Sequence, residues 1–401
     1  MKMKQKLIAA TATALFIGAS GTALAQAQPP VKIGFITDMS GLYADIDGDG
    51  GLEAIKMAIE DFGGTVLGRK VEVISADHQN KADIAASKAR EWVDRDGVTV
   101  LFGGTNSGTA LATAKVALEK KRIYINNGAG SSALTNEQCS PYTVHYTYDT
   151  IAMANGTGKG MIGKGGKTWF FLTADYAFGY ALEKDAAAVV VADGGKVLGN
   201  VRHPLNASDF SSYLLQAQNS KAQVLGLANA GGDTINTVKA ANEFGITKTM
   251  KIAGLLVFIS DVHSMGLKSA QGLYATEAWY WDQNDETRKF GKRFFGKMKR
   301  MPSMVQAGNY SSTMTYLNAV KAAGTDNADK VMEQLRKVKI NDMFTKGGYI
   351  RKDGTMVHTM YLFEVKTPAE SKSPWDYYKL ISTIPGEQAF PIASYSQCTL
   401  K

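Results

Sequence analysis

The sequence predicts an α/β protein of two lobes, each built on a parallel β-sheet. Between residues 31 and 127, short apolar segments rich in β-branched residues alternate with segments of helical spacing. This is the pattern of a parallel sheet covered by helices on both faces. The same alternation restarts at residue 168 and continues to residue 257, and a chain of 401 residues is long enough for two such lobes.

The two repeats have the same order of elements. In the first, strands are expected at 31–37, 71–77, 98–104 and 123–127, separated by helices at 51–62, 82–94 and 108–121. In the second, strands are expected at 168–174, 196–202, 222–228 and 251–257, separated by helices at 180–193, 209–219 and 233–244. The remaining chain predicts a strand within 272–281, helices near 286–300, 309–323 and 328–338, and a hairpin over 347–365 that turns at Asp353-Gly354.

Residues 1–25 have the features of a secretory signal peptide. A basic start, MKMKQK, is followed by a short apolar run from Leu7 to Ile17 and by the cleavage-site sequence ALA before Gln26. No cysteine lies beside this site for lipid attachment, and no later segment has the ~20 apolar residues of a transmembrane helix. We therefore expect a periplasmic protein that does not insert into the membrane.

The chain contains two cysteines, Cys139 and Cys398. An oxidising compartment favours their pairing, so we expect one long-range disulfide that ties down the C-terminal tail. Two separate buried thiols remain the alternative, because sequence alone does not show proximity.

The charge of the chain does not indicate a nucleic-acid partner. Loss of three lysines with the signal peptide lowers the formal charge from +8 to +5. The most basic stretch, 288–300, carries Phe290, Phe294 and Met298 at a spacing of four, which is typical of an amphipathic helix with a solvated cationic face.

The segment 44–56 resembles the start of a calcium-binding loop. Asp45, Asp47, Asp49 and Gly50 match its first positions, but its last position requires a bidentate Glu and is occupied by Lys56. We therefore expect a loop that leads from a strand into a helix.

No cofactor, metal or catalytic site is expected. A G-x-G-x-x-G pattern at Gly158, Gly160 and Gly163 follows a helix and precedes a strand, the reverse of the order that dinucleotide binding requires. The five histidines show no metal-ligand spacing, and no G-x-S-x-G motif is present.

Two loops have the composition of a ligand site. The segments 103–115 and 125–135 each follow a predicted strand with small residues, and the first opens a helix at Ser107 and Thr109. Free amides at a helix start, together with hydroxyl groups, favour a carboxylate. Both loops lie at the carboxyl edge of the predicted sheet, where α/β proteins bind ligands. Ordinary helix capping without a ligand is the alternative.

The order of several segments resembles the periplasmic solute-binding proteins of ABC transporters, of the leucine/isoleucine/valine-binding type. The segments are VKIGFITDMSG, GLEAIKMAIEDFGG, GGTNSGTALATAKVALEKKRIYINNGAGSSALT, TADYAFGYALE and NAGGDTINTVKAANEFG. The resemblance implies two Rossmann-like lobes that close like a Venus flytrap, joined by crossovers near 147, 277 and 346. It places 31–147 plus 278–346 in the N-terminal lobe and 148–277 plus 347–401 in the C-terminal lobe. It also implies a monomer that delivers its ligand to an inner-membrane permease.

The same resemblance implies half of an amino-acid site. The residues that hold the carboxylate of the ligand correspond to Asn106, Ser107, Gly128 and Ala129. The acidic residue that neutralises the ammonium group corresponds to Leu256, and a threonine that contacts both groups corresponds to Gly130. Burying a cation without a counter-charge costs several kcal/mol, so an α-amino acid is a poor candidate.

Further positions carried over from the family are Tyr148, Tyr176, Asn229 and Trp279. Each aromatic residue could instead pack the hinge or the core. We expect a non-enzymatic receptor for a small organic carboxylate, with an aromatic or hydrophobic acid as the best candidate. The alternatives are an uncharged amide or urea compound, a branched-chain amino acid, or a periplasmic enzyme that uses the cleft.

Overall fold

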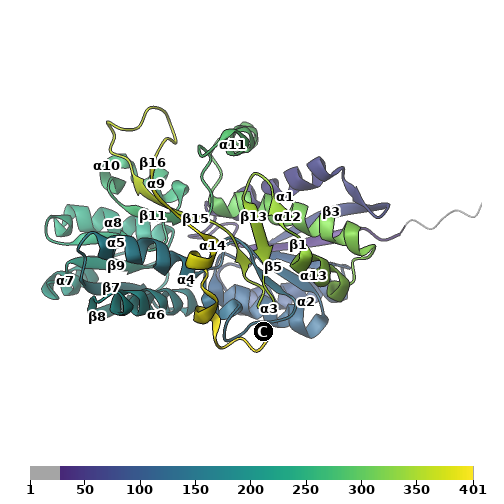
Figure 1. The fold of residues 1–401 in the computed structure, drawn as a ribbon, viewed down its shortest axis with the longest axis horizontal. Coiled ribbons are helices and arrows are strands. Elements are labelled where there is room, and N and C mark those ends of the chain that lie inside the picture. The colour runs from purple at the N-terminus through teal and green to yellow at the C-terminus, as the bar shows by residue number, and fades with distance from the viewer. Residues whose placement is uncertain (1–27, 401) are drawn as a thin grey trace, which may run out of the picture.

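The computed structural model describes residues 28–400 and has the predicted two-lobed α/β architecture (Figure 1). The expected signal peptide, residues 1–25, lies outside the described residues. Each lobe contains a parallel sheet between two layers of helices, with the first lobe on the right of Figure 1 and the second on the left.

The first sheet has the strand order β2-β3-β1-β4-β5-β6, in which only the β2–β3 pair is antiparallel. Its strands are β1 (Val31–Thr37), β2 (Thr65–Val66), β3 (Arg69–Asp77), β4 (Val100–Gly103), β5 (Ile123–Asn126) and β6 (Thr143–His145). The helices are α1 (Gly48–Phe62), α2 (Ala82–Asp94), α3 (Ser107–Lys120), α11 (Asp285–Met298), α12 (Met304–Ala323) and α13 (Ala328–Lys337). Helices α2 and α3 pack together on one face, and α1 and α12 on the other (Figure 1).

The second sheet is fully parallel, with the order β10-β9-β7-β8. Its strands are β7 (Thr168–Ala174), β8 (Lys196–His203), β9 (Val224–Ala228) and β10 (Lys251–Gly254). The helices are α4 (Thr150–Met153), a π-helix (Ala154–Gly158), α5 (Lys159–Gly163), α6 (Ala177–Ala192), α7 (Ser211–Asn219), α8 (Gly232–Glu243), α9 (Ile259–Met265) and α10 (Leu267–Ala270). The G-x-G-x-x-G pattern at Gly158, Gly160 and Gly163 therefore lies at the end of a helical segment that precedes β7, as expected.

The expected hairpin over 347–365 divides between two sheets. Its first part is β13 (Lys346–Ile350) paired with β14 (Met356–Val357), and β12 (Ile340–Asn341) pairs with the other edge of β13. A parallel bridge between His145 and Thr355 joins this hairpin to the first lobe. The turn at Asp353-Gly354 is confirmed, but the continuous return strand to residue 365 is wrong, because the chain leaves for the second lobe after β14.

The continuation of the hairpin, β15 (Met360–Val365), lies in a third, antiparallel sheet between β11 (Tyr274–Glu277) and β16 (Tyr378–Ile384). The third passage between the lobes thus lies near His358, later than the crossover expected near 346. A short helix, α14 (Gly386–Ala389), follows β16.

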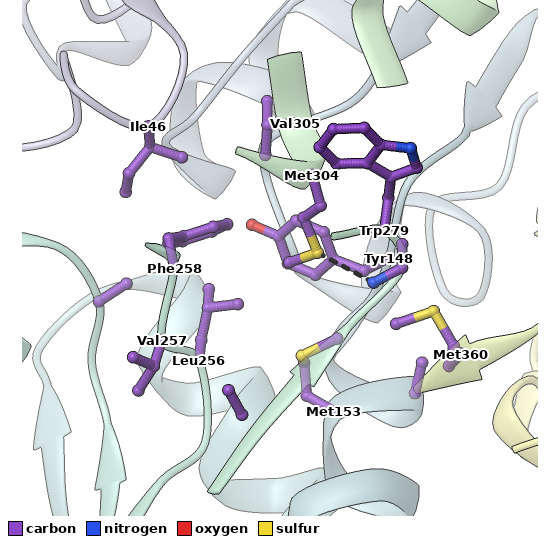
Figure 2. Close-up of a cluster of buried hydrophobic side chains, with 14 of the residues drawn as sticks. Ile46, Tyr148, Met153, Leu256, Val257, Phe258, Trp279, Met304, Val305 and Met360 are labelled. Atoms are coloured by element: carbon purple, nitrogen blue, oxygen red, sulfur yellow. Dashed lines mark hydrogen bonds between the residues drawn. The ribbon is translucent and has the colours of Figure 1, made fainter. Parts of the chain in front are cut away.

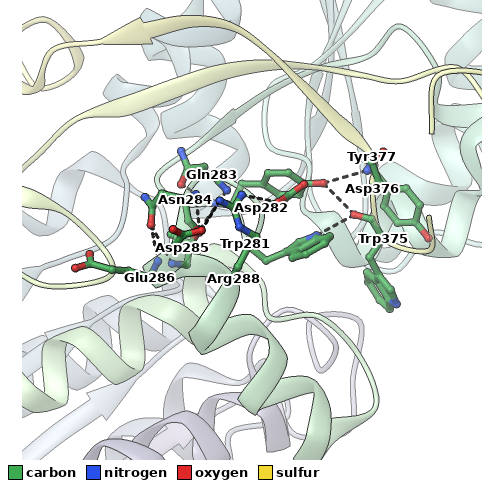
Figure 3. Close-up of polar contacts among 12 residues, drawn as sticks. Trp281, Asp282, Gln283, Asn284, Asp285, Glu286, Arg288, Trp375, Asp376 and Tyr377 are labelled. Carbon is green, nitrogen blue, oxygen red and sulfur yellow. Dashed lines mark hydrogen bonds and ion pairs between the residues drawn. The ribbon is translucent and has the colours of Figure 1, made fainter. Parts of the chain in front are cut away.

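The loop between β15 and β16 returns to the segment that leads from β11 into α11 (Figure 3). The Trp281 indole N–H donates to the Trp375 carbonyl at 2.9 Å, and the Tyr280 hydroxyl donates to the same oxygen at 2.9 Å. Arg288 pairs with Asp282 at 2.9 Å at the start of α11. These contacts fasten the second crossing to the antiparallel sheet.

The acidic segment after β1 is a strand-to-helix loop, as expected. Asp47 accepts hydrogen bonds from the Thr37 hydroxyl at 2.7 Å and from the Asn309 amide at 2.6 Å, while Asp45 pairs with Arg300 at 2.6 Å. Asp45 and Asp47 therefore contact different protein groups and do not converge on one cation. Among residues 28–400, no group of three or more His, Cys, Asp or Glu is placed to hold a metal.

The basic stretch that begins α11 is an amphipathic helix, as predicted. Phe290 and Phe294 are buried, and Arg293 and Lys297, which lie beside them on the helix, pair with acids of α1. Arg293 binds Asp61 at 2.8 Å. No helix in the described part of the chain is long and apolar enough to cross a membrane.

The predicted disulfide between Cys139 and Cys398 is present, with the two Cα atoms 5.7 Å apart. The tail is further held by Asn136, which donates to the Ser394 carbonyl and accepts from the Gln397 N–H. The C-terminal tail therefore lies against the loop between β5 and β6 of the first lobe.

Candidate functional site

A cavity lies between the two lobes at the carboxyl ends of their parallel strands, where α/β folds bind ligands. The space between the lining atoms is about 230 Å3, part of it open to solvent, and the centre of a water-sized sphere fits in only about 10 Å3 of it. The lining residues from the first lobe and the crossing are Tyr43, Ile46, Thr105, Gly128, Gly130 and Tyr148; those from the second lobe are Tyr176, Phe178, Ala230, Leu256 and Phe258. All are buried except Tyr176, which is part-buried.

Each contributing loop follows a strand. Tyr43 and Ile46 follow β1, and Thr105 follows β4. In the second lobe, Leu256 and Phe258 follow β10, where the apolar run leaves the sheet at Gly254 instead of at the expected residue 257. The strand is therefore shorter than predicted, and the rest of its apolar run contributes to the cavity wall.

Four of the nine residues predicted for the site line the cavity, namely Gly128, Tyr148, Tyr176 and Leu256. Figure 2 shows Leu256 and Phe258 beside the Tyr148 ring, with Ile46 facing them from the first lobe. The predicted segments of both lobes therefore meet around one space.

The predicted residues at the start of α3 lie next to the cavity but not on its wall. Asn106 caps the helix, because its side-chain oxygen accepts from the N–H groups of Gly108 and Thr109. The Ser107 hydroxyl is fully buried and accepts from the Ser131 N–H at 3.1 Å. The wall position at this loop belongs to Thr105.

Two further predicted residues, Ala129 and Asn229, have partners in the protein. The Ala129 carbonyl accepts from the side-chain amide of Asn126 at 2.6 Å and lies 2.7 Å from His145 Nε2. Asn229 accepts from the Thr234 hydroxyl at 2.7 Å, and its neighbour Ala230 lines the cavity.

Trp279 belongs to the buried cluster beside the cavity (Figure 2). Its indole N–H donates to the Met343 carbonyl at 3.1 Å, and its ring meets Phe290 edge-on at 5.8 Å. These contacts are those of hinge packing, the alternative that the sequence left open.

Gly130 explains why the threonine of the resembled family has no counterpart here. A Cβ atom at this position would lie 2.9 Å from ring carbons of both Phe178 and Tyr148. Real Cβ contacts are essentially never that short. The two rings therefore occupy the space that a side chain at residue 130 would need, which makes the wall more aromatic.

The side chains that line the cavity are uncharged and mostly apolar. Among residues 28–400, no Asp, Glu, Lys, Arg or His lines the cavity. Burial raises the pKa of Tyr43, Tyr148 and Tyr176 above the ordinary value, so all three phenols are neutral. The Tyr148 hydroxyl donates to the Gly128 carbonyl at 2.5 Å.

Backbone amides supply the remaining polarity. Within residues 28–400, the N–H groups of Thr105, Gly128 and Gly130 donate to no protein acceptor. Buried N–H groups are almost always paired in native proteins. The three amides belong to residues that line the cavity, so they are candidate donors to a bound acceptor.

A family model described as periplasmic binding protein matches residues 30–372. The chain belongs to the periplasmic binding protein family. A solved periplasmic binding protein from Burkholderia mallei is 68% identical, covers 92% of this chain and 99% of its own, and superimposes with a TM-score of 0.91. A branched chain amino acid ABC transporter periplasmic ligand-binding protein from Burkholderia xenovorans LB400 is 41% identical, with the same two coverages and a TM-score of 0.83.

The curated relatives are also binding proteins. A Leu/Ile/Val-binding protein homolog 6 of Brucella melitensis is 28% identical over 347 residues, which are 82% of this chain and 85% of the relative. Like these periplasmic binding proteins, the protein is a solute-binding component of an ABC transporter and not an enzyme, which confirms the function class predicted from the sequence.

Sequence reasoning missed six lining residues: Tyr43, Ile46, Thr105, Phe178, Ala230 and Phe258. Ile46 lies within the segment 44–56 weighed as a calcium loop and Tyr43 directly precedes that segment, while the other four lie within two residues of a predicted site residue. Their shared signal is position, since each follows the carboxyl end of a parallel strand.

Proposed function

We propose that this periplasmic binding protein captures a small aromatic or otherwise hydrophobic carboxylate and delivers it, as a monomer, to an inner-membrane ABC permease. The observation that carries the proposal is the composition of the interlobe cavity. Its wall combines aromatic and aliphatic side chains with amide donors, and no charged side chain of the described part of the chain lines it. Such a site suits an apolar body with one acceptor-rich end.

The carboxylate end would lie at the first lobe. The unpaired N–H groups of Thr105, Gly128 and Gly130 would donate to the carboxylate oxygens. The Ser107 hydroxyl, which within residues 28–400 accepts one hydrogen bond and donates none, could supply a further donor. Charge-assisted hydrogen bonds of this kind are about twice as strong as neutral ones.

The apolar end would lie against Tyr148, Phe178, Leu256 and Phe258. No carboxylate of residues 28–400 lines that end, so an ammonium group there would have no counter-charge in direct contact. The nearby buried acids have other partners, since Asp261 accepts from the Phe258 N–H and Glu277 accepts from the Tyr378 hydroxyl. Neither lines the cavity.

The name of the Burkholderia xenovorans relative makes a branched-chain amino acid the second candidate. Solved structures of the same fold from Rhodopseudomonas palustris hold benzoate and 3,4-dihydroxybenzoic acid, but at 20% and 24% identity they support the fold alone. The choice between the two ligand classes therefore depends on Leu256 and on the amides.

Calorimetry with matched ligands tests the proposal. We expect leucine to bind at least about tenfold more weakly than 4-methylpentanoate, which lacks the amino group, because the desolvated ammonium stays unpaired. Benzoate should bind more tightly than benzamide, because the amide donors favour a charged acceptor.

Tight binding of leucine would overturn the proposal in favour of an amino-acid receptor. Stronger binding of benzamide than of benzoate, without dependence on salt, would favour the uncharged class of ligand. Gel filtration at several protein concentrations tests the monomer.

A further inference from the structure

Two phenols from opposite lobes meet in the cavity. Tyr43 stands in the loop after β1, and Tyr176 stands at the start of α6 in the second lobe. Their hydroxyl oxygens are 2.6 Å apart, so one phenol donates to the other. Both residues line the cavity.

The pair has unused hydrogen-bonding capacity. Two O–H hydrogens are present and the mutual bond uses one, while the other has no acceptor among residues 28–400. Each phenol oxygen also keeps acceptor capacity. The third phenol of the wall, Tyr148, differs, because its hydrogen is taken by the Gly128 carbonyl.

Hydrogen bonds to Asp38 fix the loop that carries Tyr43. Asp38 is fully buried, and its carboxylate accepts from the N–H groups of Gly41 at 2.6 Å and Tyr43 at 3.0 Å. The Asn80 side-chain amide donates to the same carboxylate at 2.7 Å. A loop fixed in this way positions the phenol before the lobes close.

The environment of the pair disfavours a second carboxylate at this place. Asp233, at the start of α8, accepts from the N–H groups of Asn206 and Ala207, and burial raises its pKa to about 6. It is therefore largely ionised at neutral pH, and its charge raises the pKa of both Tyr43 and Tyr176. A neutral group that both donates and accepts fits better.

We propose that the Tyr43–Tyr176 pair recognises a hydroxyl group on the ligand, so that the cargo is a hydroxylated aromatic acid. The inference rests on the proposed function, in which the amides of the first lobe hold the carboxylate. Those amides can only donate, whereas the phenol pair can both donate and accept, as a hydroxyl group requires. The two ends of the cavity would thus recognise different groups.

The test compares benzoate with 3-hydroxybenzoate and 4-hydroxybenzoate by calorimetry in the full mature protein. The variants are Tyr43→Phe and Tyr176→Phe, with Tyr180→Phe as the matched control on the same helix, since its hydroxyl bonds to Asp175 outside the cavity. We expect the wild type to prefer one hydroxybenzoate over benzoate by at least about tenfold. Each cavity variant should lose most of this preference, and the control should keep it.

The ratio of the two affinities separates recognition from closure. Loss of the bond between the phenols weakens closure over every ligand alike, so it leaves the ratio unchanged. Equal weakening for benzoate and hydroxybenzoate would therefore overturn the inference and make the pair a lobe latch. A ratio near one in the wild type would also overturn it, with the proposed function intact. Absence of binding by all three acids would overturn the proposed function itself.

Discussion

A substitution at Ser107 distinguishes a ligand-binding role of the loop before α3 from a purely structural role. Its hydroxyl accepts from the Ser131 N–H, and its own hydrogen has no acceptor among residues 28–400. If it donates to a carboxylate, Ser107→Ala should remove a charge-assisted bond worth about 1.5–3 kcal/mol and weaken binding roughly ten- to a hundredfold. Titration with the acid that binds best measures this.

Thr109→Ala is the control for this prediction, because the Thr109 hydroxyl lies in the same helical turn and donates to the Asn106 carbonyl at 2.7 Å. It should weaken binding less. The melting temperatures of both variants should stay close to that of the wild type. Unchanged affinity in Ser107→Ala, or a loss that follows unfolding, would assign this loop to structure alone.

The sequence could predict which loops form the candidate site but not which side chains face it. Ser107 and Thr105 are both small hydroxyl residues after β4, yet only Thr105 lines the cavity. Tyr43 directly precedes the acidic segment 44–56, and nothing in its local sequence marks it as a binding residue. Whether a loop residue faces the cleft depends on how the second lobe docks, and local spacing carries no information about that contact.

At the scale of elements, regular spacing predicted most strands and helices, with β1 and β7 at their predicted bounds. The prediction failed where one apolar run serves two purposes. The run through β14 and β15 reads as a single strand, but the backbone moves from one sheet to another within it. Alternation predicts burial and does not predict the partner strand.

The disulfide gives a prediction for the C-terminal tail. Thiol titration of the unfolded, unreduced mature protein should find no free thiol. Cys139→Ser combined with Cys398→Ser should destabilise the fold by about 2–4 kcal/mol, because the bond closes a loop with a sequence separation of 259 residues. Chemical denaturation measures the free energy of unfolding. Two free thiols, or an unchanged midpoint, would contradict this prediction.

Glu277 ends β11 at the second crossing and is buried. Its Oε1 atom accepts from the Tyr378 hydroxyl, and its Oε2 atom has no partner among residues 28–400. Burial, helped by the charge of Asp261, raises its pKa well above the ordinary 4.5. The folded state therefore holds a proton there that the unfolded chain releases as the pH rises.

This sign sets the pH dependence of stability. The contribution of Glu277 is fully present below about pH 4.5 and is lost as the pH rises towards the folded pKa, by at most about 1.4 kcal/mol per pH unit. The variant Glu277→Gln carries no such proton. Between pH 5 and pH 8, the melting temperature of Glu277→Gln should therefore rise relative to that of the wild type. Parallel curves would show that Glu277 is ionised in the folded protein.

For the whole molecule, closure depends on a close approach at Gly231. This residue has a φ of +58°, and a Cβ atom there would lie 2.8 Å from the Leu42 carbonyl oxygen and 3.1 Å from the Tyr43 ring. Gly231→Ala should therefore hold the lobes apart and weaken the binding of every ligand by at least about tenfold. Calorimetry and small-angle scattering with ligand measure both effects.

Gly245→Ala is the matched control. Gly245 also has a positive φ, of +70°, but a Cβ atom there would meet only the Lys248 side chain at 3.7 Å. It should lose about 1 kcal/mol of stability through backbone strain and bind normally. If the two variants bind alike, Gly231 does not control closure.

The lobes also meet along α6. The Ser132 hydroxyl donates to Asp185 at 2.9 Å, and Lys184 pairs with Glu137 at 2.8 Å. Together with the phenol pair, these contacts hold the two lobes together around the buried lining residues.

That enclosure has a kinetic consequence. A molecule cannot reach a buried chamber by diffusion alone, so uptake must wait for the lobes to separate. In stopped-flow mixing, the observed rate should rise with solute concentration and then level off at the rate of spontaneous opening. Release also requires the lobes to separate, so a ligand bound in the closed form should exchange slowly until the transporter opens the lobes.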